Sequence, residues 1–177
     1  FDFPSEMEYV EGTFPEGLFP MVAITEAGSE DFSFKNVSGV LKLLLKGEDA
    51  VKSLTVQGNA GEPLSGNGAV SVSFSNPVPV VSMSESAGKA VKVDCGFGVQ
   101  LKSDAPTAFI IPLPPTVFEN GFNVVVDSQT GARMTLNTSS RAEVKRSTIL
   151  SMPEILFEPT GGVQIEAMSV TFNEILI

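Results

Sequence analysis

The sequence predicts an all-β protein whose strands form a β-sandwich. Apolar residues alternate with polar ones over several short segments, as in strands that bury one face. Twelve prolines and sixteen glycines separate these segments, and prolines in sheets belong at edges, bulges and turns. No amphipathic pattern is long enough for a helix of three turns, so a helical bundle is disfavoured.

The longest alternating segment predicts a strand over residues 91–101. Its apolar members are Val91, Val93, Cys95, Phe97, Val99 and Leu101. We expect these side chains on the buried face of the strand. Gly96 and Gly98 lie between them and indicate a bulge or a close backbone approach. The same alternation predicts a strand over residues 70–75. Most of the thirteen phenylalanines fall at such apolar positions, where a core role is expected.

Two further patterns predict neighbouring strands. Residues 122–126 and 133–136 are expected to form a hairpin around the glycine-containing loop 127–131. Residues 40–46 could be helical by propensity, but the segment is short and flanked by turns, so we predict a strand. Leu44 interrupts its alternation. Both faces of this strand are therefore expected to be covered.

The C-terminal residues 163–177 are apolar with few charges. They are either the last strand of the same sheet, or an extension that pairs with another subunit or begins a following domain. We therefore divide the chain into a β-sandwich domain over 1–160 and a C-terminal strand or extension over 161–177. The chain begins inside what looks like a structured segment, so we expect a processed fragment without its targeting signal.

The chain is acidic, with 21 acidic and 11 basic residues and a formal net charge of -10. Nucleic acids and anionic membrane surfaces are therefore disfavoured as partners. Residues 1–31 hold eight carboxylates and neither Lys nor Arg. This segment is either a solvated edge or a Ca²⁺ site, although no D-x-D-x-D-G spacing supports the second interpretation. No stretch reaches the length of a membrane span.

Enzyme chemistry is disfavoured by the residues that are missing. Histidine is absent, which removes the usual general base, the Ser-His triad and most transition-metal sites. Cys95 is the single cysteine, so no internal disulfide forms, and we expect it to be a small core hydrophobe rather than a nucleophile. We predict a non-enzymatic protein and nominate no catalytic, cofactor-binding or metal-binding residues.

Direct ligand binding would be carried by loops between strands. The candidates are residues 58–68 and 84–89, which are polar, glycine-rich and expected to be mobile. Gly58 to Gly61 and Gly66 to Gly68 lack the helix and lysine of a phosphate loop and are interpreted as hairpin turns. Glycosidase chemistry needs only two carboxylates, which this chain could supply. Sugar sites normally also use aromatic side chains, but Trp is absent and Tyr9 is the single tyrosine. Both a glycosidase and a carbohydrate-binding site are therefore disfavoured.

Several phrases occur in a characteristic order along the chain. They are LFPMVAI at 18–24, FKNVSGVLKLLLKG at 34–47, VKSL at 51–54, GN at 58–59, GEPLSG at 61–66, IPLPP at 111–115, Phe118, GF at 121–122, RSTI at 146–149 and MP at 152–153. This ordered set resembles the fimbrillin-like proteins of Bacteroides and related organisms over roughly residues 1–158.

The resemblance implies a transthyretin-like antiparallel β-sandwich with Greek-key connections. It also implies export as a lipoprotein and display at the outer membrane. In polymerising relatives a protease removes an N-terminal segment, often after an arginine, and a strand from a neighbouring subunit fills the exposed groove. No arginine precedes Arg133. Such processing would therefore occur upstream of Phe1, because cleavage at Arg141 or Arg146 would remove late strands.

We therefore expect a non-enzymatic cell-surface adhesin or fimbrial subunit that needs no cofactor. Its expected partners are neighbouring fimbrial subunits bound by strand exchange and, in addition, a host glycan or protein. Membrane attachment is expected only through a lipid anchor that this chain does not contain. The alternative is a carbohydrate- or host-ligand-binding module of a single surface lipoprotein.

Overall fold

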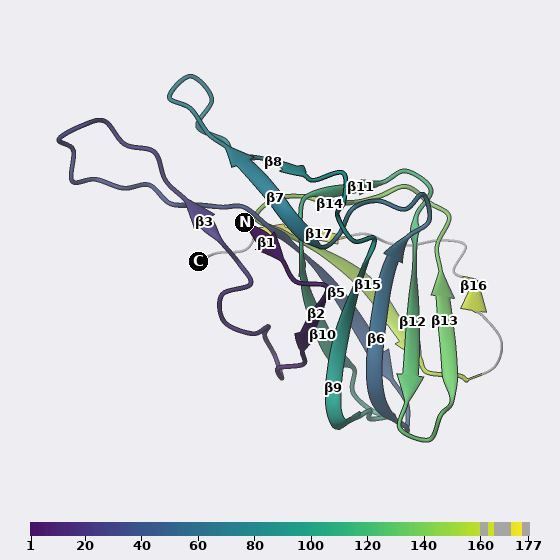
Figure 1. Cartoon of the computed structure of the whole chain (residues 1–177). Coiled ribbons are helices and arrows are strands. Elements are labelled where there is room, and N and C mark those ends of the chain that lie inside the picture. The colour runs from purple at the N-terminus through teal and green to yellow at the C-terminus, as the bar shows by residue number, and fades with distance from the viewer. Residues whose placement is uncertain (160–162, 165–170, 175–177) are drawn as a thin grey trace.

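The protein is a β-sandwich of two main sheets (Figure 1), seen in a computed structural model that describes residues 1–159, 163–164 and 171–174. The first sheet has six strands in the order β16 (Val163–Gln164), β13 (Arg133–Asn137), β12 (Phe122–Ser128), β6 (Ala50–Gly58), β9 (Ala90–Gln100) and β2 (Glu6–Glu8). The second has four, in the order β10 (Thr107–Leu113), β5 (Gly39–Lys46), β15 (Thr148–Leu156) and β17 (Thr171–Glu174). No helix among the described residues could cross a membrane.

Three smaller sheets flank the sandwich. They are β1 (Asp2–Phe3), β7 (Gly66–Ser71) and β8 (Val80–Met83); β11 (Thr116–Phe118) and β14 (Ala142–Val144); and β3 (Met21–Val22) and β4 (Lys35–Asn36). The β7–β8 hairpin and the long segment that follows β3 extend away from the sandwich in Figure 1.

The core lies between the two main sheets and is built from alternating residues. On β5, Leu41, Leu43 and Leu45 are fully buried, whereas Lys42 and Leu44 are half-buried on the opposite face. The prediction of a strand over 40–46 is therefore confirmed, and its second face is partly covered. The predicted hairpin is confirmed as well, because β12 and β13 pair antiparallel on either side of the loop.

The prediction of an antiparallel sandwich is wrong for three strand pairs. β5 pairs with β15, β2 with β9, and β13 with β16, all in parallel. Each of these pairs joins segments that are distant in the sequence. Parallel neighbours need a long connection instead of a tight turn, and for this reason local turn patterns do not reveal them.

The predicted strand over 70–75 ends earlier than its alternation indicates. β7 stops at Ser71, and Phe74 is exposed in the loop beyond it. Within the described residues β7 pairs with β1 and β8, and its residues are half-buried or exposed. Gly66 to Gly68 lie inside β7 and not in a hairpin turn, which corrects that interpretation too.

The expectation that the phenylalanines mostly fill the core holds for only part of the set. The buried ones are Phe3, Phe109, Phe118, Phe122 and Phe157. Those with exposed side chains are Phe1, Phe32, Phe34, Phe74 and Phe97. Except for Phe97, the exposed phenylalanines lie at the N-terminus or in the two segments that extend from the sandwich, where no facing sheet is present to bury them.

The segment at residues 58–68 makes contacts with neighbouring turns. Asn59 Nδ2 donates hydrogen bonds to the carbonyl oxygens of Asn120 and Thr138, both at 2.7 Å. Leu64 and Ser65 are buried. This loop therefore holds neighbouring turns together, although Asn59, Ala60 and Pro63 are exposed.

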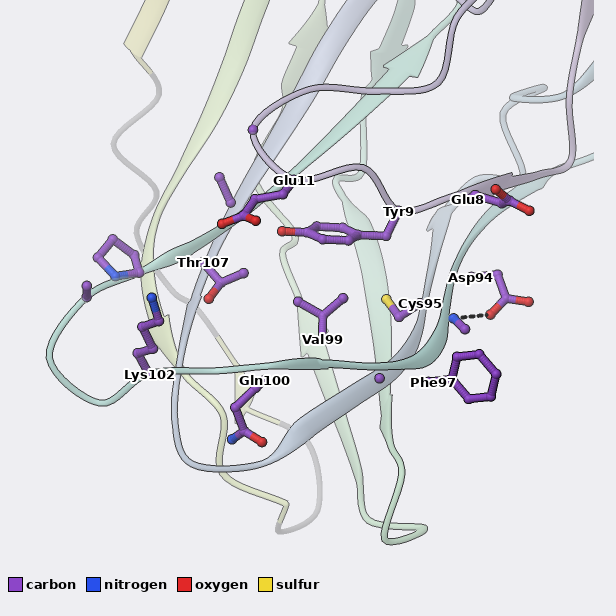
Figure 2. A pocket seen from close by; sticks show the side chains of 16 residues that line it. Glu8, Tyr9, Glu11, Asp94, Cys95, Phe97, Val99, Gln100, Lys102 and Thr107 are labelled. Atoms are coloured by element: carbon purple, nitrogen blue, oxygen red, sulfur yellow. Dashed lines mark hydrogen bonds between the residues drawn. The ribbon is translucent and has the colours of Figure 1, made fainter.

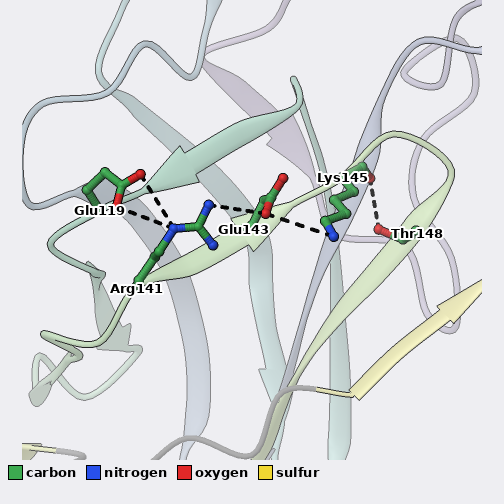
Figure 3. Close-up of polar contacts among 5 residues, drawn as sticks. All are labelled: Glu119, Arg141, Glu143, Lys145 and Thr148. Atoms are coloured by element: carbon green, nitrogen blue, oxygen red, sulfur yellow. Dashed lines mark hydrogen bonds and ion pairs between the residues drawn. The ribbon is translucent and has the colours of Figure 1, made fainter. Parts of the chain in front are cut away.

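Ion pairs line the exposed side of the small β11–β14 sheet (Figure 3). Arg141 Nε lies 3.3 Å from Glu119 Oε2, and Arg141 Nη2 lies 3.4 Å from Glu143 Oε2. Lys145 Nζ is 4.0 Å from the same Glu143 oxygen. Exposed pairs of this kind contribute about 0–1 kcal/mol each, so they orient the strands more than they stabilise the fold.

The turn before β15 is fixed by contacts to the segment around β4. Arg146 Nη1 donates to the Asn36 carbonyl at 3.0 Å, and the Ser147 amide donates to the Ser38 carbonyl at 2.9 Å. Ser147 has a φ of 60°, which is rare for a residue other than glycine. A cut after Arg146 would therefore fall in a tightly held turn and detach β15.

Candidate functional site

A wide bulge interrupts β9 in the middle of its pairing with β6. Val51 pairs with Val99 and Ser53 pairs with Asp94, so residues 95–98 stand opposite a single residue of β6. Gly96 and Gly98 have φ values of 54° and 105°, a backbone conformation that L side chains rarely adopt. The bulge predicted from these two glycines is therefore confirmed.

Polar contacts hold the bulge in place. Asp94 Oδ1 accepts a hydrogen bond from the Gly96 amide at 2.9 Å, and Gln129 Nε2 donates to the Gly96 carbonyl at 3.0 Å. A side chain at Gly98 would also press against Gln129. The loop between β12 and β13 thus contacts the bulge through Gln129 and helps to hold its backbone in place.

The bulge reverses the expected direction of Phe97. Cys95 is 7% exposed, but Phe97 is 107% exposed and projects into solvent at the apex. The extra residues break the alternation after Cys95, so Phe97 leaves the buried face that the sequence pattern predicts for it. The prediction for Phe97 is therefore wrong, while Val91, Val93, Cys95 and Leu101 are buried as expected.

Beside the bulge lies a cavity of about 870 Å³ (Figure 2). Three separate segments line it: the end of β2 and the chain that follows, from Glu8 to Gly12; the bulge of β9; and the residues around Thr107 at the start of β10. In Figure 2 the Tyr9 ring lies on one side, with Val99 and Cys95 opposite and the Glu11 carboxylate near the phenol.

Tyr9 is held on this side by backbone and ring contacts. Its amide donates to the Asp94 carbonyl at 2.8 Å, and its ring packs against buried Phe109 with centroids 5.1 Å apart and a tilt of 51°. Burial, followed by the nearby Glu11 carboxylate, raises the pKa of the Tyr9 phenol. The phenol is therefore a neutral hydrogen-bond donor over the whole physiological range.

Three carboxylate residues border the cavity, but the side chains of Glu8 and Asp94 point away from the Tyr9 ring (Figure 2). The parallel pairing of β2 with β9 places Glu8 beside Asp94, and Glu11 follows shortly after. Asp94 lies 3.9 Å from Lys92 Nζ, whereas Glu8 and Glu11 form no ion pair within the described part of the chain. Lys102 is the one cation among the lining side chains.

Cys95 lies at the inner wall of the cavity and is chemically quiet. Burial, together with the Asp94 carboxylate and against the opposing effect of Lys92, raises the pKa of its thiol to about 12. The thiolate is the nucleophilic form, so this thiol is unreactive near neutral pH. The expectation of a small core hydrophobe fits its burial.

We predict that Cys95 makes the stability of the protein fall in alkaline solution. The unfolded thiol loses its proton near its ordinary pKa of 9.0, whereas the folded thiol keeps it up to about 12. The stabilisation is therefore complete below about pH 9 and is lost as the pH rises toward about 12. Urea unfolding of wild type and Cys95→Ala at about pH 8 and about pH 11 should show a smaller alkaline loss in the variant. Equal losses would contradict the prediction.

The eight carboxylates of residues 1–31 are all exposed. Among the residues that the structure describes, no group of three or more His, Cys, Asp or Glu side chains is arranged to hold a metal ion. The exposure of these carboxylates agrees with the interpretation of the segment as a solvated edge. Neither of the loops nominated from the sequence lines the cavity.

A second feature is the edge of the four-stranded sheet. β17 pairs antiparallel with β15, from Thr148 opposite Glu174 to Ser151 opposite Thr171. Residues 171–174 thus form a strand of the sandwich, as one of the two interpretations of the tail expected. The boundary at residue 160 and the remainder of the tail (residues 160–162, 165–170 and 175–177) lie outside the described residues.

The chain matches no protein-family model and no curated protein. A solved structure from Bacteroides ovatus, provisionally assigned to cell adhesion, superimposes with a TM-score of 0.52 at 10% identity, covering 82% of this chain and 48% of its own. The two share a fold. A similarly assigned Bacteroides uniformis structure has a TM-score of 0.43 at 8% identity, covering 81% of this chain and 52% of its own. The chain thus spans about half the length of these proteins.

Proposed function

We propose that the protein is a cell-surface adhesin subunit that binds without catalysis and joins neighbouring copies in a fibre by strand exchange. The observation that carries the proposal is the position of β17, which supplies the outermost strand of the four-stranded sheet from the C-terminal tail. The fold shared with the Bacteroides ovatus protein supports an adhesive role. The proposal includes export, a lipid anchor carried outside these residues, and a transthyretin-like, Greek-key sandwich.

The physical basis is the edge that β17 covers. Without this strand, the outer N–H and C=O groups of β15 from Thr148 to Ser151 would lack ladder partners. The equivalent strand of a neighbouring copy would pair with the same edge equally well. Exchange of this kind is head-to-tail, and it builds an open filament when the rotation between successive copies does not close a ring.

We predict that deletion of residues 163–177 abolishes polymers. The measurement is an immunoblot of sheared surface material from the native organism, with and without boiling in detergent. Wild type should give a heat-sensitive ladder with regular mass steps, and the deletion a single band at monomer mass.

A point variant separates loss of pairing from loss of the tail. Asn173 sits opposite Ile149 in the β15–β17 pairing, where proline would fix φ and remove the N–H of a strand of only four residues. Asn173→Pro should therefore weaken the polymer bands on the blot, while Asn173→Ala should leave them intact. A ladder that persists after the deletion would rule out strand exchange through this tail.

The cavity favours a second candidate function, a ligand-binding module of a single surface lipoprotein. A volume of about 870 Å³ with an aromatic wall and a polar rim is typical of sites for small ligands or peptide side chains. A monomer-sized band in heated and unheated samples, together with selective binding to glycans or host proteins on an array, would favour this function over the fibre.

A further inference from the structure

We propose that β8 is a contact surface between two copies of this chain, which pair β8 against β8 around a two-fold axis and form a dimer. β8 is the outer strand of the small sheet β1-β7-β8 and belongs to the hairpin that extends from the sandwich in Figure 1. The contact uses a different edge from the strand exchange through β17 and does not depend on it.

Hydrogen bonds on the two sides of β7 fix the direction in which its backbone groups face. Gly68 exchanges both of its backbone hydrogen bonds with Phe1, at 2.7 and 2.8 Å, so these groups face β1. The neighbouring residue Asn67 faces the other way, because its carbonyl accepts a hydrogen bond from the Ser84 amide at 3.0 Å. Since successive residues of an antiparallel strand alternate in this respect, the register of the whole hairpin is determined.

This register shows which backbone groups of β8 are left for a partner. Val80 and Ser82 lie opposite residues of β7 that face β8, so their N–H and C=O groups are used within the hairpin. The N–H and C=O groups of Val81 and Met83 point away from β7 instead. Within the described part of the chain these outward groups form no hydrogen bond. They are a free template for another strand.

The free groups are complementary to those of a second β8. In an antiparallel pair centred on Ser82, Val81 of each copy lies opposite Met83 of the other. Each such pair can exchange both of its N–H···O=C bonds, which satisfies every outward group of the strand. Val81 and Met83 are half-buried on one side of the hairpin, and Val80 and Ser82 are exposed on the other. The pairing therefore also brings like side of the sheet next to like side.

The charge of the protein favours a contact between copies at this edge. The net charge of -10 makes two copies repel wherever their carboxylates meet. Residues 63–84 contain no Asp, Glu, Lys or Arg and form the longest such stretch of the chain. Exposed sheet edges are commonly protected by charged side chains, especially lysine, and β8 has none. A highly charged partner strand would find no opposite charge on β8, whereas a second copy needs none.

The residues that flank β8 limit the contact to a dimer. Pro77 and Pro79 precede the strand, and proline cannot donate a hydrogen bond to a ladder. In the register centred on Ser82, the two Glu85 side chains lie at opposite ends of the contact and do not face each other. A two-fold contact uses the same edge of both copies, so pairing stops at two. Because the edge is short, we expect a dissociation constant of about 0.1 mM.

The test is sedimentation velocity of the full chain at concentrations from about 10 µM to about 1 mM. The average mass should rise toward twice the monomer mass and should fall again on dilution. Added salt should strengthen the dimer, because it screens the repulsion between two acidic copies. Asn173→Pro, which should weaken strand exchange through β17, should leave this equilibrium unchanged.

Matched variants test the register. Ser82→Lys and Ser82→Glu each place like charges opposite each other across the two-fold axis and should weaken the dimer at least about tenfold. Ser71→Lys, at an exposed position of the neighbouring strand β7, should change the dissociation constant by less than about twofold. An equimolar mixture of the Ser82→Lys and Ser82→Glu proteins should dimerise again, because opposite charges then face each other. Circular dichroism of each variant confirms that it is folded.

A disulfide gives a second readout of the same contact. Residues directly opposite each other in a non-hydrogen-bonded antiparallel pair have Cα atoms about 4.5 Å apart, which is within disulfide range. Mild oxidation should therefore convert Ser82→Cys into a covalent dimer and should leave Ser71→Cys monomeric. The wild type should form no covalent dimer, because Cys95 is buried and the pKa of its thiol is raised to about 12.

Three results would overturn the inference. The first is a chain that stays monomeric at about 1 mM, which would leave the edge to a strand of a different protein. The second is equal dimerisation of Ser82→Lys and Ser71→Lys, which would place the contact elsewhere. The third is a mixture of the two charged Ser82 variants that associates no better than either variant alone.

The outcome is independent of the fibre proposal. A dimer that persists in Asn173→Pro, without a heat-sensitive ladder from the native organism, rejects strand exchange alone. An intact ladder from a chain that forms no dimer through β8 rejects the present inference alone.

Discussion

Replacing Gly121 with alanine is expected to lower the free energy of unfolding by at least about 3 kcal/mol. Gly121 has a φ of 71°, where an L side chain costs about 1–2 kcal/mol. A Cβ there would also overlap the carbonyl oxygen of Thr138, and a backbone atom cannot move aside as a flexible side chain can. The Asn59 amide donates to the Gly121 carbonyl at 3.1 Å, so displacing the turn would strain the β6–β7 connection as well.

The measurement is urea unfolding followed by far-UV circular dichroism, with Gly131→Ala as the matched control. Gly131 has a φ of 86°, and a Cβ there would meet no atom within 4 Å. The control therefore carries only the backbone strain, about 1–2 kcal/mol. Equal losses of stability in the two variants would contradict the prediction. They would mean that the Thr138 carbonyl moves away from the new methyl group at little energetic cost.

Replacing Phe109 with alanine is expected to cost about 3–5 kcal/mol, the range for large-to-small changes in a packed core. Phe109 is fully buried on β10, between the main sheets. It is also the ring against which Tyr9 packs, with centroids 5.1 Å apart. Its loss should therefore loosen one wall of the cavity as well as the core.

Tyr9 gives this variant a local readout in addition to global unfolding. The chain contains one tyrosine and no tryptophan, so tyrosine fluorescence and near-UV dichroism at tyrosine wavelengths report on this wall alone. Phe109→Ala should change both in the folded state, and Phe109→Leu, which keeps most of the volume, should cost less than about 1.5 kcal/mol. If Phe109→Ala cost less than about 1.5 kcal/mol, the surrounding core would have to relax into the space that the ring leaves.

Local patterns predicted some of the strands that contribute to the core, but not β10 or β15. The alternation of Leu41, Leu43 and Leu45 and the hairpin after Phe122 follow from period 2 and turn residues, and both are present. The same reasoning failed at Phe74 and Phe97. Alternation predicts burial only where a second layer faces the strand and where no extra residue shifts the register, and neither condition can be judged from residues in one segment.

The cavity was not predictable in the same way. The two glycines around Phe97 were the one local pattern that pointed to it, through the bulge that they predict. Its other walls come from Tyr9 and from the residues around Thr107, which are brought to the bulge by parallel pairing of β2 and by the β9–β10 connection. Such long-range neighbours leave no periodic trace in the sequence.

The parallel pairing of β5 with β15 also constrains when the protein can fold. Val40 lies beside Ile149, more than one hundred residues later in the chain. β5, an inner strand of the four-stranded sheet, therefore stays without this neighbour until residues beyond Ile149 have been synthesised. Closing so large a loop is slow compared with forming a hairpin. During that interval the apolar side of β5 is exposed to self-association, so we expect folding yield to depend on keeping the chain from aggregating until β15 is available to pair.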